Sequence, residues 1–182
     1  SPRVIVKSSQ LAYAISSLKS LVAKNLQVAY HNLAVDAIGN RDFETAIFYA
    51  DKSGERDLVQ NAYQNGAIYY MKQNNFKKAR YFADKSGETD LVKTIRHNEG
   101  VYYYKRDNIT KALSIFTSLG DENMKKACYQ KQYNKLVKKL SGVRTMADVK
   151  RHRSTYRKML HLAQKMGDST LERSVRDTLS RI

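Results

Sequence analysis

Three pairs of polar residues stand 33 residues apart and carry side chains that can hold a peptide backbone. They are His31-Asn32, Gln64-Asn65 and His97-Asn98. A carboxamide offers both a hydrogen-bond donor and an acceptor, so each asparagine could pair with the two polar groups of an extended peptide. The competing interpretation is that these asparagines are ordinary repeat positions, which bond a neighbouring helix and bind no ligand.

The sequence does not predict an enzyme. It contains no glycine-rich phosphate loop, no Gly-x-Ser-x-Gly and no His-Glu-x2-His, and its acidic residues form no evident catalytic pair. His152 and His161 do not lie on adjacent helical turns, because nine residues separate them. Cys128 is the single cysteine, which excludes an intramolecular disulfide and a cysteine zinc site, and we expect it to be buried. We therefore expect neither a metal nor a cofactor.

The spacing of 33 residues extends through the central part of the chain. The sequence of Ala50–Glu55 returns unchanged at Ala83–Glu88. A looser third copy follows, because Gly54, Gly87 and Gly120 keep the same interval. A fixed period of this length is typical of stacked supersecondary units, none of which can bury its apolar face alone.

Composition and capping signals predict that each unit is a pair of helices. One proline and eight glycines in 182 residues favour helix over strand. Each repeated glycine is expected to end the second helix of its pair, where a left-handed residue is needed. The expected pairs are 26–39 with 42–52, 57–73 with 75–85, and 90–105 with 108–118.

The expected organisation has three parts. Residues 1–25 form an N-terminal helix that begins at Ser8 or Ser9 and could be half of a degenerate repeat. Residues 26–120 form three repeats, and residues 121–182 form a fourth, partial repeat with basic helices that cap the array. The helices expected in this last part are Met124–Leu140, Met146–Met166 and a final helix opened by the capping-box sequence Ser169-x2-Glu172.

The central region resembles tetratricopeptide repeats, helical hairpins of about 34 residues with a Trp-x2-Leu-Gly-x2-Tyr core. The matching residues are Tyr30-x2-Leu33-Ala34, Tyr63-x2-Gly66-Ala67-x2-Tyr70, Gly100-x2-Tyr103, Phe43-x2-Ala46, Phe76-x2-Ala79 and Ile109-x2-Ala112. The chain departs from the family in its 33-residue spacing and in the absence of a proline that closes each repeat. The resemblance implies an all-α fold, a right-handed superhelix (solenoid) of three to four helix pairs, that acts as a protein-interaction scaffold.

The resemblance also implies where a partner would bind. In the family, the two polar positions lie on the first helix of each repeat and face the concave groove, where the asparagine resembles a residue that holds a bound peptide. Apolar side chains would form the floor of this groove, and basic residues would attract an acidic ligand. The expected partner-binding residues are His31, Asn32, Val35, Gln64, Asn65, Ile68, Lys72, His97, Asn98, Val101, Tyr104 and Lys105.

Positive charge is concentrated in the C-terminal third. The formal net charge is +16, from 33 Lys and Arg against 17 Asp and Glu. Residues 121–182 hold 16 of the basic and 6 of the acidic side chains. One face of the expected helix Met146–Met166 would carry a basic surface, made of Lys150, Arg151, Arg153, Arg157, Lys158 and Lys165.

Four interpretations of this basic surface stay open at the level of sequence. It could be a solvated face, or it could contact an acidic protein, the phosphates of RNA or DNA, or an anionic membrane surface. We expect an acidic protein or peptide partner, with nucleic-acid binding by the basic helices as the alternative. Membrane insertion is not expected, because no run of 18 apolar residues occurs. We also expect a cytoplasmic location, and the start at Ser1 without methionine suggests a piece of a longer protein.

Overall fold

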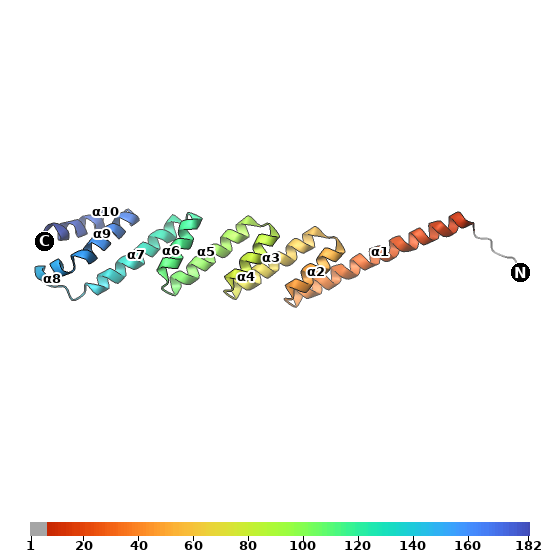
Figure 1. Cartoon of the computed structure of the whole chain (residues 1–182), viewed down its shortest axis with the longest axis horizontal. Coiled ribbons are helices and arrows are strands. Elements are labelled where there is room, and N and C mark those ends of the chain that lie inside the picture. Colours follow the sequence, from red (N-terminus) through yellow and green to blue (C-terminus); the bar gives the residue numbers. More distant parts are fainter. Residues whose placement is uncertain (1–6) are drawn as a thin grey trace. The chain divides into compact units, whose positions relative to one another are not determined.

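A computed structural model describes residues 7–182 of the chain. Within this range every regular element is an α-helix, and the helices pack as neighbouring pairs (Figure 1). The all-α prediction is therefore confirmed, and the pairing is compatible with a helical-repeat solenoid. The chain divides into two compact units after Ile95, a residue inside helix α5 (Thr89–Lys105).

The first unit contains four helices before α5. They are α1 (Ser8–Gly39), α2 (Phe43–Ser53), α3 (Arg56–Lys72) and α4 (Phe76–Ser86). Helix α2 packs against both α1 and α3, and α3 packs against α4. Small side chains allow this close approach, since Ala37, Ala46 and Ala62 from three successive helices form one buried cluster.

The turns between repeats contain the expected left-handed glycines. Gly54 and Gly87 have φ of 78° and 75°, and each follows the last residue of α2 or α4. In the second unit Gly120 has φ of 67° after α6 (Ile109–Leu119). A residue with a Cβ is strained in this conformation, so the glycine spacing in the sequence reports a backbone requirement.

The turns inside the pairs also repeat, in a way that the sequence does not reveal. Arg41, Asn74 and Asp107 all have positive φ, of 63°, 56° and 65°, although none of them is glycine. The residue that follows each of them caps the next helix through its side-chain oxygen. These caps are Asp42, Asn75 and Asn108, which accept the backbone N–H groups of Thr45, Lys78 and Lys111 at 3.2, 3.2 and 3.3 Å.

Helix α1 differs from the prediction of a separate helix within residues 1–25. It begins at Ser8, with Lys7 rather than a serine at the N-cap, and continues without a break to Gly39. The reason lies at residue 21, which is 33 residues before Gly54 but is a leucine. Leucine favours the continuing helix over the left-handed turn that glycine permits.

The second unit contains five helices after α5. They are α6, α7 (Glu122–Lys139), α8 (Met146–Arg151), α9 (Arg153–Met166) and α10 (Ser169–Ser180). Helix α7 packs against α6 and α9, and α9 packs against α10. Phe116 and Cys128 lie in one buried cluster, and Tyr133 and Met159 lie in another. The predicted burial of Cys128 is confirmed, and burial raises the pKa of its thiol.

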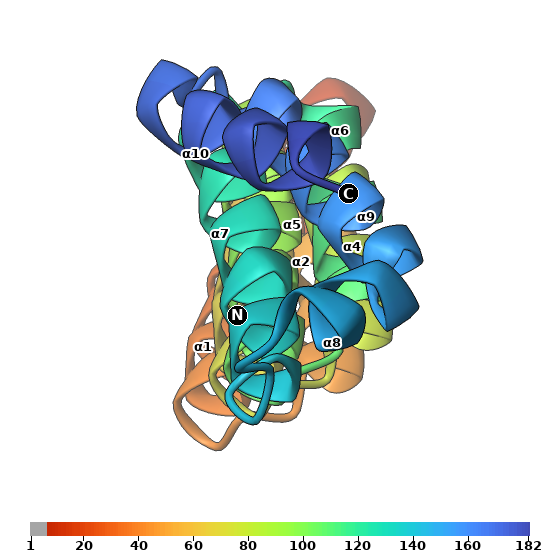
Figure 2. The same ribbon diagram turned by 90° about the vertical axis from the view of Figure 1, so that its left-hand side faces the viewer.

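Helices α7 and α9 form a fourth pair that contains an insertion. Helix α9 ends at Gly167, which has φ of 69° like the repeat glycines. Gly167 lies 47 residues after Gly120, which is 14 more than the repeat spacing of 33. Most of the additional residues lie between α7 and α9 and include the short helix α8 (Figure 2), and the others lengthen these two helices.

Two predictions in this region are wrong. The single helix expected from Met146 to Met166 is interrupted at His152, which has φ of −98° and ψ of 16°. The ring Nδ1 of His152 lies 2.9 Å from the carbonyl oxygen of Asp148, so the side chain competes for a helix acceptor at the break. In addition, the cap of the last helix is Asp168 rather than Ser169, because the Asp168 carboxylate accepts the backbone N–H groups of Thr170 and Leu171.

Candidate functional site

Three of the predicted partner-binding residues contact an acidic residue of their own fold. Nδ1 of His31 lies 2.9 Å from the Glu55 carboxylate, and Nδ1 of His97 lies 3.1 Å from the Asp121 carboxylate. At the equivalent position, Nε2 of Gln64 donates to Glu88 at 2.9 Å. The sequence separation is 24 residues in every case, so this contact recurs with the 33-residue period. We call these three contacts the turn contacts.

The turn contacts favour a structural role for His31, Gln64 and His97. Each acidic residue directly follows a left-handed glycine, so each contact joins the first helix of a pair to the turn that ends the pair. These positions therefore match the interpretation of ordinary repeat residues that bond a neighbouring segment. The sequence contained a signal for this role, namely an acidic residue after every repeat glycine.

The asparagines next to these positions are placed differently. Nδ2 of Asn65 donates to the backbone oxygen and the side-chain oxygen of Asn61, at 2.9 and 2.8 Å, on its own helix. Its carboxamide oxygen accepts no hydrogen bond from the described residues. The carboxamide oxygen of Asn65 is therefore not occupied by a hydrogen bond within residues 7–182. The other predicted residues with exposed side chains are Asn32, Val35, Ile68, Lys72, Asn98 and Lys105.

A hollow in the first unit brings three predicted residues together. Its volume is about 330 Å³, and Asn65, Ile68 and Lys72 of α3 line it. The turn between α1 and α2 forms the opposite wall, where the Arg41 guanidinium lies 5.4 Å from the centre of the Tyr69 ring. The complete lining is Ile38, Gly39, Arg41, Phe43, Asn65, Ile68, Tyr69, Lys72 and Gln73.

Two residues predicted for the apolar floor of the groove belong to the edge of a core. Val101 and Tyr104 of α5 are half-buried and pack against the cluster around Phe116 and Cys128. The Lys131 ammonium lies 4.6 Å from the centre of the Tyr104 ring. These contacts satisfy both side chains within the second unit, so they are less suited to hold a partner than the exposed residues of α3.

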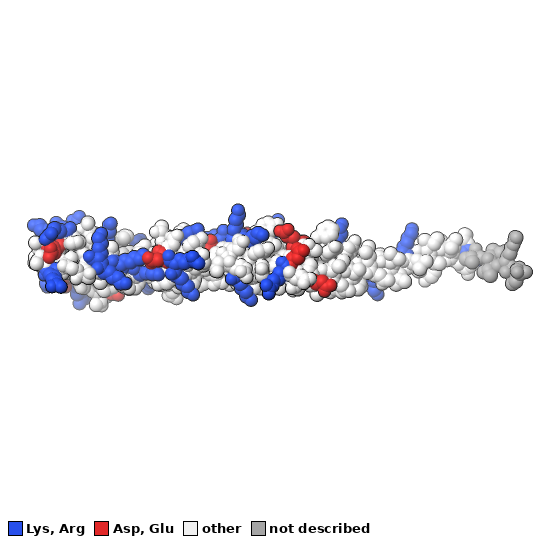
Figure 3. All heavy atoms as spheres, turned by 90° about the horizontal axis from the view of Figure 1, so that it is seen from below, with Lys and Arg blue, Asp and Glu red and all other residues white. Residues whose placement is uncertain are grey.

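The six residues of the predicted basic surface are all exposed, but they are divided between two helices. Lys150 and Arg151 lie on α8, and the other four lie on α9. Arg151 pairs with Asp148 at 2.7 Å. Hydrogen bonds from the Thr145 side chain and backbone hold the pKa of Asp148 below its ordinary value, and the charge of Arg151 contributes. The other five have no acidic partner among residues 7–182, and Figure 3 shows lysine and arginine gathered over the second unit.

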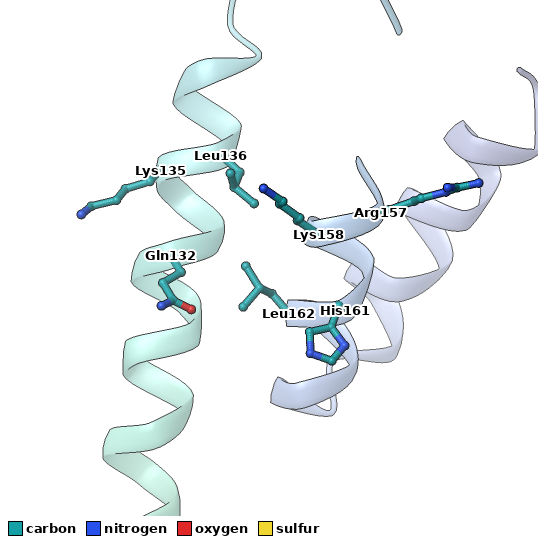
Figure 4. Close-up of a pocket in the computed structure, with 7 residues that line it drawn as sticks. All are labelled: Gln132, Lys135, Leu136, Arg157, Lys158, His161 and Leu162. Carbon is teal, nitrogen blue, oxygen red and sulfur yellow. The ribbon is translucent and has the colours of Figure 1, made fainter. Parts of the chain in front are cut away.

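A hollow in the second unit lies between α7 and α9. It has a volume of about 580 Å³, and Leu136 of α7 and Leu162 of α9 point toward one another across it (Figure 4). The side chain of Lys158 extends toward α7, whereas Lys135 and Arg157 point away from the gap. The complete lining is Gln132, Lys135, Leu136, Arg157, Lys158, His161 and Leu162. We call this feature the α7–α9 hollow.

Only part of the positive charge around the α7–α9 hollow is neutralised. Lys135 Nζ lies 2.6 Å from the Asp107 carboxylate, and Lys131 Nζ lies 3.5 Å from it. The hydrogen bond from Lys135 is the main reason that the pKa of Asp107 is lowered. Arg157 and Lys158, by contrast, have no acidic partner among the described residues. The hollow therefore combines an apolar floor with the cation of Lys158, which extends toward α7, while the unpaired cation of Arg157 points away from the gap.

Sequence reasoning missed most of this hollow. It identified Arg157 and Lys158, but it did not place them beside Leu136 and Leu162. The two leucines lie on helices whose pairing is obscured by the longer connection between them, which includes α8.

Other site types are not indicated in the described range. Among residues 7–182 no group of three His, Cys, Asp or Glu side chains is arranged to hold a metal ion. No helix in that range is both long and apolar enough to cross a membrane. No protein-family model matches the chain, and no curated protein matches it.

Proposed function

We propose that this chain is a protein-interaction module in which tetratricopeptide-like repeats present a docking site for an acidic, amphipathic segment of a partner protein. The observation that carries this proposal is the α7–α9 hollow, where the half-buried Leu136 and Leu162 lie beside Arg157 and Lys158, whose cations have no acidic partner among residues 7–182. No catalytic role is proposed, and the cytoplasm is the expected location.

The apolar floor supplies the larger share of the binding free energy in this proposal. Burying one leucine or phenylalanine of the partner contributes about 1.5–3 kcal/mol, whereas an exposed ion pair contributes about 0–1 kcal/mol. The cations mainly attract and orient the acidic segment. A partner sequence with a large apolar residue flanked by Asp or Glu matches both features.

The hollow of the first unit supports a second contact for an extended segment of the same partner. The carboxamide oxygen of Asn65 can accept a backbone N–H, and Lys72 can meet a carboxylate. This site is ranked below the α7–α9 hollow because its volume is smaller, about 330 against about 580 Å³.

RNA binding is the second candidate, because five exposed cations of the predicted basic surface have no acidic partner among residues 7–182. Phosphates would contact these cations without using the apolar floor. Such binding falls log-linearly with salt, with a slope of about −0.7 per phosphate neutralised on a single strand.

The test compares two fluorescent probes by anisotropy, a helical peptide with glutamates around a central leucine stripe and a single-stranded RNA of uridines. The double variant Arg157→Glu and Lys158→Glu should weaken peptide binding about tenfold, the equivalent of about 1.4 kcal/mol for two exposed ion pairs. The control is Lys150→Glu with Arg153→Glu, which makes the same change of charge outside the hollow. Leu162→Ala should also weaken the peptide and leave RNA binding unchanged.

Three outcomes would contradict the proposal. Equal effects of the two double variants on the peptide would show that only net charge matters. Tight RNA binding with a steep salt dependence, lost in both double variants, would favour the alternative. No binding of either probe, with unchanged circular dichroism, would remove both candidates.

A further inference from the structure

The N-terminal part of α1 exposes a continuous apolar stripe. Every residue from Lys7 to Ala29 is exposed, and this segment has no neighbouring helix within the first unit (Figure 1). At about 100° per residue, seven apolar residues fall within an arc of about 80° on this helix. They are Leu11, Ile15, Leu18, Val22, Leu26, Ala29 and Leu33. We call this set the α1 stripe.

Comparison with α3 shows that the C-terminal end of the α1 stripe, at Ala29 and Leu33, lacks a packing partner. Thirty-three residues after Ala29 lies Ala62, which is fully buried in the cluster with Ala46 of α2. Leu33 is 44% exposed, whereas its equivalent Gly66 is buried. The same repeat positions therefore face a neighbouring helix in α3 and face solvent in α1. An exposed stripe of this kind marks an interaction surface.

The spacing of the stripe indicates which surface covers it. The intervals between successive members are 4, 3, 4, 4, 3 and 4 residues, which read the same in both directions around Val22. Two copies of α1 that run antiparallel can therefore match every apolar residue with another apolar residue. Val22 would meet Val22 of a second copy, Leu18 would meet Leu26, and Ile15 would meet the small Ala29. An interface between identical surfaces requires this self-complementarity.

The charges on α1 are compatible with the antiparallel arrangement. Lys19 and Lys24 are the only Lys, Arg, Asp or Glu residues from Ser8 to Val35. With Val22 at the centre, Lys19 lies across from Asn25 of the other copy, and Lys24 lies across from Ser20. A parallel pair would instead place each lysine beside the same lysine of the second copy, which is unfavourable.

We propose that α1 pairs with α1 of a second copy of this chain in an antiparallel arrangement, with a two-fold axis at Val22. The α1 stripe of each copy forms the interface. This pairing supplies tertiary contacts to residues 8–29, which a single copy leaves without any. A helical segment without such contacts is only marginally stable in water. The proposal is independent of the docking site in the second unit.

The first experiment measures the mass of the chain by sedimentation equilibrium. The parent protein should behave as two chains of 20.9 kDa, and Val22→Asp should reduce it to one. The matched control is Tyr13→Asp, which places the same charge on the same helix, outside the stripe. Tyr13 is 76% exposed, so this variant should remain a dimer. Hydrogen exchange should show that residues 8–29 lose protection in Val22→Asp only.

The second experiment tests the orientation by disulfide formation between introduced cysteines. Val22→Cys should form a covalent dimer on oxidation. Leu18→Cys and Leu26→Cys should each form little disulfide alone, but a mixture of the two should form the mixed dimer. The parent is the control, because its only cysteine, Cys128, is buried.

Several results would overturn this proposal. A parent protein that sediments as a single chain would exclude the pairing. A dimer that persists in Val22→Asp would assign the interface to another surface. Efficient disulfides in Leu18→Cys alone would show a parallel pair, which contradicts the proposed arrangement.

Discussion

The turn at Gly54 and the uninterrupted helix at Leu21 occupy equivalent positions of the 33-residue repeat and have opposite consequences. At Gly54 the chain turns, α2 and α3 pack together, and Ala46 and Ala62 become buried. At Leu21 the helix continues, and the equivalent apolar residues remain exposed. One side chain at the turn position thus decides whether apolar surface is used within the repeat or left for another molecule.

The same contrast holds in the second unit. Where the repeat is regular, polar side chains such as His97 form turn contacts inside the fold. Where the connection between α7 and α9 is longer than in the regular pairs, the hollow between these helices is lined by half-buried leucines and exposed cationic residues. Both proposed interaction surfaces therefore coincide with departures from the repeat. The regular parts supply a scaffold, and the irregular parts supply surface.

The largest effect on stability is expected when the turn residue Gly54 is replaced by leucine, the residue found at the equivalent position 21. Gly54→Leu should lower the free energy of unfolding by about 1–2 kcal/mol, because a bulky residue is strained at a φ of 78°. Nothing lies within 4 Å of a Cβ placed at Gly54, so the cost comes from the backbone and not from a clash. Urea unfolding followed by circular dichroism measures it. Gly54→Ala should show most of the same loss, and an unchanged midpoint in both variants would refute the explanation.

A smaller effect is expected from the turn contacts. Gln64→Ala should cost about 0.5–1.5 kcal/mol, the net value of one hydrogen bond, through loss of its contact with Glu88. Asn65→Ala is the neighbouring control and should cost less, since Asn65 bonds only within its own helix. A double-mutant cycle of Gln64 and Glu88 in thermal unfolding isolates the pair. A coupling of zero would mean that the contact does not support the turn.

The smallest effect concerns how the stability of the second unit depends on pH. Lys135 lowers the pKa of Asp107 in the folded state below its ordinary value of 3.8. A lowered carboxyl pKa stabilises the fold above the unfolded pKa, and this contribution disappears as the pH falls through the folded pKa. Asp107→Asn keeps a residue that tolerates the left-handed backbone, so only the charge changes. The melting temperatures of parent and variant should differ slightly at pH 6 and converge as the pH falls through the folded pKa of Asp107; a constant difference would contradict this assignment.

The sequence predicted the features that depend on strict backbone requirements. The glycines at 54, 87 and 120 indicated the turns, because glycine adopts that conformation without the steric cost of a Cβ. The left-handed residues Arg41 and Asn74 were not predictable, because their residue types differ and each tolerates other conformations. The break at His152 was missed for a similar reason, since neither glycine nor proline marks it.

The candidate site was only partly predictable from the sequence. The positions of Asn65, Ile68 and Lys72 on one face of a helix followed from helical spacing, and the structure places all three around one hollow. The prediction that Gln64 contacts a ligand did not take into account the acidic residue after Gly87, which Gln64 contacts in the structure. The α7–α9 hollow depends on which helices pair after an insertion, and no periodic pattern reports that pairing.

The packing of each helix against its neighbours in sequence also determines how the chain acquires its structure. The cluster of Ala37, Ala46 and Ala62 spans only 26 residues, and α3 closes onto α4 across one short turn. These contacts join residues that are close in sequence, so forming them costs little loop-closure entropy. Proteins rich in such contacts fold rapidly. Each helix pair of the first unit can therefore assemble as soon as it leaves the ribosome, before the rest of the chain has been made.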